Sequence, residues 1–134
     1  MTSPDTKKKL PRKELPADAR IETLAVREGL PATQWGENSE ALFLTSSFNH
    51  PDAATAAARF ANEEEAFVYS RFTNPTTMMF ERRLAALEGT EAAIATASGQ
   101  AALHLAIATL MGAGSHIVAS TALYGGSQNL LHYT

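Results

Sequence analysis

The stretch that decides the fold is Ala92-Ala93-Ile94-Ala95-Thr96-Ala97-Ser98-Gly99-Gln100-Ala101-Ala102. Ala92 to Ala97 has the composition of a short apolar strand, and Ser98-Gly99 forms a corner before an almost wholly apolar helix. A strand that turns directly into a helix leaves backbone N–H groups unpaired, and with the helix dipole they attract a phosphate or carboxylate. Many α/β folds have such a corner for packing alone, so the stretch by itself leaves both interpretations open.

The residues downstream repeat the strand-and-helix pattern. The helix from about Gln100 to Met111 is followed by two glycines, a second apolar strand at Ser115–Ser120 and a further helix at 126–134. Strand, helix, strand and helix with short connections predict a βαβ unit in a parallel sheet. Because the first helix is apolar nearly all round, we expect it to be buried on most sides, with His104 in the core or an interface.

The predicted sheet places two chemical groups at one edge. Ligands of open parallel sheets bind at the carboxyl ends of the strands, where Ser98–Gln100 and Tyr124 both fall. An aromatic ring beside an anion site predicts a flat, phosphorylated ligand. His104 and His116 lack the spacing of metal ligands, so no metal is assigned.

Composition excludes several classes of protein. The chain has 134 residues, of which 45% are hydrophobic, and its net charge of −3 gives no indication of a nucleic-acid surface. Without cysteine, a disulfide framework and a thiolate site are excluded, which fits a cytoplasmic protein. The N-terminal lysines have no apolar segment behind them and do not form a secretory signal, and no apolar run approaches the length of a membrane span.

Lysine occurs only near the N-terminus of this sequence. All four lie within the first 13 residues, and none occurs from Glu14 to Thr134. We expect a disordered polar leader at 1–19, an arm with helices that makes subunit contacts at 20–66, and the first part of an α/β domain at 67–134. The chain stops inside a predicted helix without a capping signal, so we interpret it as the front of a longer protein; the alternative is a complete small domain.

The N-terminal half contains two short predicted helices and one extended segment. A helix within Arg20–Gly29 ends at Gly29, and Asp52 can cap a helix from about Ala53 to Asn62. Between them, Ala41–Phe48 is extended by composition without a clean alternation, so we expect an arm on another surface rather than a sheet strand.

A second informative stretch is Phe67-Val68-Tyr69-Ser70-Arg71-Phe72-Thr73-Asn74-Pro75-Thr76. Asn74 is a good N-cap and Pro75 suits the first helical position, so a helix is predicted from there to about Glu88, with Gly89 ending it. Its predicted apolar stripe consists of Phe80, Leu84 and Leu87.

Tyr69 and Arg71 form a candidate anion clamp. Two residues apart in an extended segment, their side chains would share one face, where a phenol and a guanidinium can hold an oxyanion. The alternative is a surface arginine beside a half-buried tyrosine, and spacing alone favours that alternative.

Four motifs together resemble the Cys/Met-metabolism family of PLP-dependent enzymes: Tyr69-Ser70-Arg71-Phe72-Thr73-Asn74-Pro75-Thr76, Leu87-Glu88-Gly89, Ala97-Ser98-Gly99 and Leu123-Tyr124-Gly125-Gly126. The resemblance covers Glu22 to Thr134. It implies the large α/β domain of a type I, aspartate aminotransferase-like PLP-dependent transferase, N-terminal part only, preceded by an extended arm.

Within the family, the segments Glu22–Arg27 and Glu40–Phe48 are most similar to O-succinylhomoserine sulfhydrylases. Ser98–Ala102 and Leu123–Ser127 are closer to O-acetylhomoserine sulfhydrylases. The resemblance implies γ-replacement of the acyl group by sulfide, giving homocysteine for methionine biosynthesis. The alternatives are O-acetylhomoserine sulfhydrylase, cystathionine γ-synthase or lyase, and, from another class, an inactive fragment that acts only in subunit association.

The resemblance also implies roles for single residues. Ser98, Gly99 and Gln100 match the turn that holds the phosphate of pyridoxal 5'-phosphate (PLP). Tyr124 matches a tyrosine that stacks on the cofactor ring and assists proton transfer, which makes it the catalytic candidate.

Tyr69 and Arg71 match a pair that reaches the phosphate of the neighbouring subunit's cofactor. Each active site would therefore be shared within a homodimer or homotetramer. The family's Schiff-base lysine lies well downstream and has no counterpart after Lys13. These 134 residues alone are therefore expected to be inactive.

Overall fold

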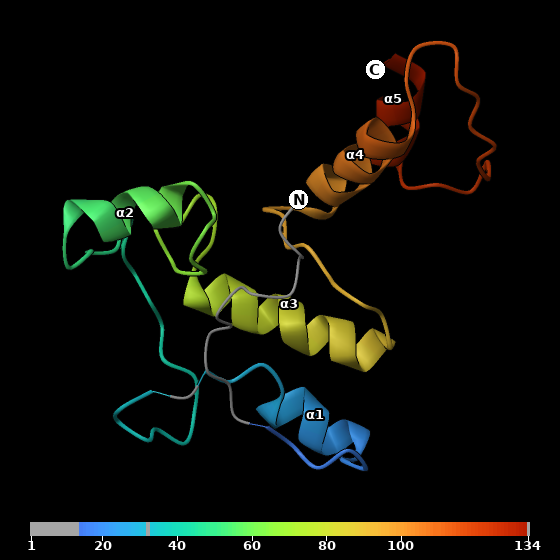
Figure 1. Ribbon diagram of the computed structural model, residues 1–134. Coiled ribbons are helices and arrows are strands. Elements are labelled where there is room, and N and C mark those ends of the chain that lie inside the picture. The colour runs from blue at the N-terminus through green and yellow to red at the C-terminus, as the bar shows by residue number, and fades with distance from the viewer. Residues whose placement is uncertain (1–13, 32, 134) are drawn as a thin grey trace. The chain divides into compact units, whose positions relative to one another are not determined.

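The computed structural model describes residues 14–31 and 33–133 (Figure 1). In chain order its helices are α1 (Ile21–Arg27), α2 (Ala53–Phe60), α3 (Pro75–Glu88), α4 (Gly99–Leu110) and α5 (Gly125–Tyr133). The described residues form two compact units, which divide between Ala93 and Ile94. Most of the predicted disordered leader and the last residue of the predicted final helix lie outside the described residues.

The first unit is built on the contact between α1 and α3, which lie side by side in Figure 1. Gly29 follows α1 with a φ of +77°, and a Cβ there would lie 2.7 Å from the Met79 carbonyl oxygen. Only a glycine lets the backbone come so close in this left-handed conformation. The buried hydrophobic residues of the described chain are Leu30, Met79 and Ala85.

The helix boundaries follow local capping chemistry. The Asp52 carboxylate accepts from the Thr55 N–H at 2.7 Å to start α2, and Asn74 Oδ1 accepts from the Thr76 N–H at 2.8 Å to start α3. Gly89 ends α3 in the left-handed conformation with a φ of +65°. These caps confirm the predicted ends, because each signal acts within one helical turn.

The predicted apolar stripe of α3 was wrong. Phe80 is 56% exposed and Leu84 36% exposed, whereas α3 buries Pro75, Met79 and Ala85. The sequence offers more than one apolar face with helical spacing. The contact with α1, made through Gly29 at Met79, selects which face is buried.

In the second unit, α4 contacts α5, and the two predicted strands are not formed (Figure 1). Among the described residues, 92–97 and 115–120 make no strand ladder, whereas Ser47 and Tyr69 form an isolated antiparallel bridge. A strand needs a neighbouring strand to exchange backbone hydrogen bonds with, and composition alone does not supply one.

The predicted burial of α4 was also wrong for the described part of the chain. No residue of α4 is buried: Leu105 is 44% exposed, Leu110 is 83% exposed, and His104 is exposed as well. An apolar helix of this kind packs on a sheet, and the described segments form none. No helix within 14–31 and 33–133 is long and apolar enough to cross a membrane.

Candidate functional site

The corner formed by Ser98, Gly99 and Gln100 lies at the start of α4. The Ser98 Oγ accepts from the Ala101 N–H at 3.1 Å, so the side chain caps the helix and its extended backbone leads into the turn. Among the described residues, the N–H groups of Gly99 and Gln100 have no acceptor. A Cβ built on Gly99 would meet no atom within 4 Å. The corner therefore presents free donors to open space, as an anion site requires.

Tyr124 lies beside this corner, at the start of α5. A Cβ added to Gly126 would lie 2.7 Å from Tyr124 Cε1 and 2.9 Å from Gln100 Nε2, so both side chains converge on the same glycine. Gln100 Nε2 also donates to the Ser127 Oγ at 3.2 Å, which links the two helix starts. The Tyr124 ring is 77% exposed and is free to stack on a flat ligand.

Gly126 and Ser127 are site residues that the sequence prediction did not name. Their role is to bring α5 against the corner, through the absence of a side chain at one position and a hydroxyl acceptor at the next. The Gly125-Gly126 pair was the available signal, since paired glycines mark close backbone approaches.

Tyr69 and Arg71 lie in the first unit and do contact each other. The Arg71 guanidinium carbon is 4.8 Å from the centre of the Tyr69 ring and 5.2 Å from that of Phe72. The prediction that an extended segment places the two side chains on one face was wrong, because the segment is a turn. The N–H groups of Phe72 and Thr73 donate to the Tyr69 carbonyl at 2.9 and 3.1 Å. The turn, and not strand alternation, brings the guanidinium over the ring.

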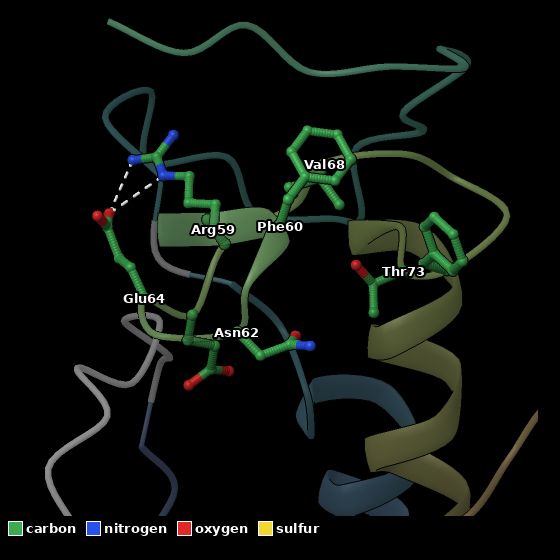
Figure 2. Close-up of a pocket in the computed structure, with 9 residues that line it drawn as sticks. Arg59, Phe60, Asn62, Glu64, Val68 and Thr73 are labelled. Carbon is green, nitrogen blue, oxygen red and sulfur yellow. Dashed lines mark hydrogen bonds and ion pairs between the residues drawn. The ribbon is translucent and has the colours of Figure 1, made fainter. Parts of the chain in front are cut away.

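A cavity of about 310 Å³ lies beside this turn, within the first unit (Figure 2). Arg59 pairs with Glu64 at 2.8 Å on one side of the cavity, and Thr73 lies on the other. His50 Nδ1 lies 3.2 Å from the same guanidinium, so Arg59 is fully engaged by protein groups. No predicted site residue lines this cavity, and its arginine is already paired with Glu64.

Two carboxylates have pKa values below their usual range, and both are structural. The pKa of Glu40 is lowered by a hydrogen bond from its own backbone N–H and by Arg83, which also donates from Nε to the Glu28 carbonyl at 3.0 Å. The pKa of Asp52 is lowered by the hydrogen bonds that it accepts from Thr55 at the start of α2. Within the described residues no group of three His, Cys, Asp or Glu side chains could hold a metal ion.

The profile of the Cys/Met metabolism PLP-dependent enzymes matches residues 22–134. The chain belongs to this family. The predicted cofactor class is thereby confirmed, and the free N–H groups of Gly99 and Gln100 beside an exposed ring fit a phosphorylated pyridine.

Three known proteins illustrate the relationship. The chain is 50% identical over 112 residues to an O-succinylhomoserine sulfhydrylase of Pseudomonas aeruginosa, covering 84% of this chain and 28% of the relative. It is 45% identical over 121 residues to an O-acetyl-L-homoserine sulfhydrylase of Leptospira meyeri. That alignment covers 90% of this chain and 27% of the relative.

The third is a crystal structure of a putative O-acetylhomoserine (thiol)-lyase from Campylobacter jejuni, which contains N'-pyridoxyl-lysine-5'-monophosphate. It superimposes with a TM-score of 0.80 at 33% identity over 87% of this chain and 29% of its own. This likeness confirms the predicted fold class, part of a type I PLP-dependent enzyme. The chain thus spans little more than a quarter of the length of these proteins.

Proposed function

We propose that this chain is the N-terminal part of a longer PLP-dependent O-succinylhomoserine sulfhydrylase, which replaces the γ-acyl group by sulfide and yields homocysteine. The observation that carries the proposal is the open corner at Gly99 and Gln100 with the exposed Tyr124 beside it. The similarity to sulfhydrylases of both ester types supports the reaction class. We expect the enzyme to act in the cytoplasm.

PLP, when bound, supplies the electron sink for this chemistry, and the protein supplies binding, orientation and proton transfer. The N–H groups of Ser98, Gly99 and Gln100 would hold its phosphate, while the Ser98 Oγ accepts the capping bond from Ala101. The Tyr124 ring would stack on the pyridine, and its Oη would take up or return a proton of the substrate.

Tyr69 and Arg71 would reach the phosphate of a cofactor held by a neighbouring subunit. Their contact makes a preassembled pair of a phenol and a guanidinium, a suitable donor set for phosphate. The active site would then be completed only in a homo-oligomer. We expect a homodimer or a homotetramer.

The Schiff-base lysine would lie in the part of the enzyme beyond these 134 residues, because no lysine follows Lys13. Borohydride reduction after incubation with PLP, followed by mass mapping, tests this directly. The longer protein should fix one pyridoxyl group outside the present sequence. A pyridoxyl group fixed at a single leader lysine of an active protein would contradict the assignment.

Steady-state rates with the succinyl and acetyl esters of homoserine, each with sulfide and with cysteine, test the substrate. The proposal predicts the highest kcat/KM for the succinyl ester with sulfide. A preference for the acetyl ester would favour the related O-acetylhomoserine sulfhydrylase activity. A preference for cysteine over sulfide would indicate a cystathionine γ-synthase.

The Tyr124→Phe variant tests the proton-transfer role separately from stacking. Phenylalanine keeps the ring, so PLP affinity should stay near the original value while turnover falls by about a hundredfold, a typical contribution of general acid–base catalysis. Unchanged turnover would remove Tyr124 from the mechanism.

A second function is favoured by the exposed apolar face of α4. The 134 residues by themselves would act only in subunit association. Co-expression with the longer protein distinguishes the two: association without any change in activity per site supports this alternative.

A further inference from the structure

The turn that contains Tyr69 and Arg71 is held by hydrogen bonds from the arm, defined here as residues 42–48. The Ser70 N–H donates to the Ser46 carbonyl at 2.9 Å, and the Phe48 N–H donates to the Val68 carbonyl at 3.2 Å. The rings of Phe48 and Phe67 lie 5.4 Å apart across the same contact. The backbone on the N-terminal side of the turn is thus fixed to a segment about 20 residues earlier in the chain.

Ser70 fixes the middle of the turn through its side chain. Its Oγ donates to the Thr45 carbonyl and accepts from Asn74 Nδ2 at 2.9 Å. Because Ser70 stands between Tyr69 and Arg71, anchoring its side chain to the arm leaves the two neighbouring side chains on the solvent side. Both are classed as exposed, and their 4.8 Å contact forms there.

Asn74 joins three parts of the first unit and is only 7% exposed. Its Oδ1 caps α3, and its two Nδ2 hydrogens go to Ser70 Oγ and to the Phe43 carbonyl at 3.0 Å. A helix cap requires only an acceptor, which serine or aspartate also provides. The two donor bonds are therefore additional to the capping role and require an amide.

We propose that Ser70 and Asn74 are positioning residues that hold Tyr69 and Arg71 as a preformed phosphate-binding pair. The inference rests on the proposed role of that pair toward a cofactor phosphate. Rigid placement lowers the ordering cost of binding, so loosening the turn should weaken phosphate recognition while the binding side chains themselves remain intact.

The test measures the Kd of the full-length apoenzyme for PLP and for pyridoxal, which lacks the phosphate, by fluorescence titration. Ser70→Ala should raise the Kd for PLP about three- to tenfold, the effect of one lost hydrogen bond, and leave that for pyridoxal unchanged. Ser70→Thr keeps the hydroxyl and should restore the original value. Thr109→Val, which removes a hydroxyl bonded to Leu105 within α4, is the matched control.

Asn74→Ser keeps a helix cap but removes the amide, and should raise the Kd for PLP by about tenfold or more. Asp52→Ser exchanges the cap of α2, which has no bond to the arm, and should change neither Kd. Arg71→Ala reports on the pair itself and should raise the Kd for PLP about ten- to a hundredfold.

The outcomes separate the two claims. If Arg71→Ala leaves the Kd for PLP unchanged, the proposed role of the pair fails, and the positioning inference fails with it. If Arg71→Ala weakens PLP binding but Ser70→Ala and Asn74→Ser stay within twofold of the original protein, only the positioning inference is overturned. It is also overturned if the Ser70 variant weakens PLP and pyridoxal equally, because that result indicates a general structural role.

Discussion

The two units of this chain differ in how far their residues are buried and hydrogen-bonded. In the first, Asn74 is buried with its amide hydrogens and carbonyl all bonded, and α1 and α3 enclose Met79 and Ala85. In the second, none of the described residues 94–133 is buried, and the N–H groups of Gly99 and Gln100 have no acceptor among the described residues. Asn74 therefore has its polar side-chain atoms bonded within the first unit, although the buried Arg82 Nη1 and Arg83 Nη2 have no partner among the described residues. The second unit presents the free donors of Gly99 and Gln100.

The two groups of candidate site residues therefore differ in how the structure holds them. Tyr69 and Arg71 are held in advance by bonds within the first unit. The corner and Tyr124 are held by two helix starts that meet at Gly126. Substitutions at the contact of α1 and α3 should therefore act mainly on stability, and those around the corner at Gly99 and Gln100 mainly on cofactor and substrate.

The largest effect is expected where the first unit is packed most closely. Gly29→Ala forces a side chain into a φ of +77° and within 2.7 Å of the Met79 carbonyl oxygen. We expect it to lower the free energy of unfolding of the full-length protein by about 2–4 kcal/mol, measured by urea denaturation. Gly89 also has a positive φ, of +65°, but a Cβ there would meet no atom within 4 Å. Gly89→Ala should therefore lower the free energy of unfolding by only about 1–2 kcal/mol. Equal losses for the two variants would contradict the close contact between α1 and α3.

The second unit should respond in activity rather than stability. Gly126→Ala would displace the Tyr124 ring and the Gln100 amide, which lie 2.7 and 2.9 Å from the added carbon. These are movable side chains, so the expected result is a fall of about ten- to a hundredfold in kcat/KM with little change in unfolding. Gly112→Ala, which meets no atom within 4 Å, serves as the control. Unchanged kinetics in the Gly126 variant would separate Tyr124 from the reaction.

Two helix caps allow the same comparison at a smaller scale. Asp52→Ala and Ser98→Ala each remove a cap and should each lower the free energy of unfolding by about 1 kcal/mol. Only the Ser98 variant should also weaken PLP binding, because that cap orders the corner. PLP titration and urea denaturation of both variants check this, and weakened PLP binding in the Asp52 variant would break the distinction.

The smallest effect is expected from the ion pair of Glu40 and Arg83. Because folding lowers the pKa of Glu40 from its usual 4.5, through a hydrogen bond from its own backbone and through Arg83, the carboxylate stabilises the fold above that pH. This stabilisation is lost as the pH falls through the lowered value. Glu40→Gln should be slightly less stable than the original protein at neutral pH, and equally stable once the pH lies well below the lowered pKa of Glu40. A difference that persists at low pH would exclude the ionised carboxylate as its source.

The local features of this fold could be predicted from the sequence because they depend on a few adjacent residues. Asp52, Asn74 and Gly89 begin or end helices through bonds within one turn, and the structure confirms all three. The family motifs likewise predicted the fold class and cofactor class that the comparisons confirm. The roles assigned to Tyr69, Arg71 and Tyr124 stay predictions.

Tertiary structure alone decided which faces are covered and which segments pair. The buried side of α3 depends on α1 reaching Met79 through Gly29, some 50 residues earlier in the chain. The bond from Asn74 to the Phe43 carbonyl joins positions 31 residues apart, and no local pattern predicts it. Apolar segments such as 92–97 and 115–120 have strand composition, but a ladder needs a neighbouring strand, and that neighbour is a property of the whole fold.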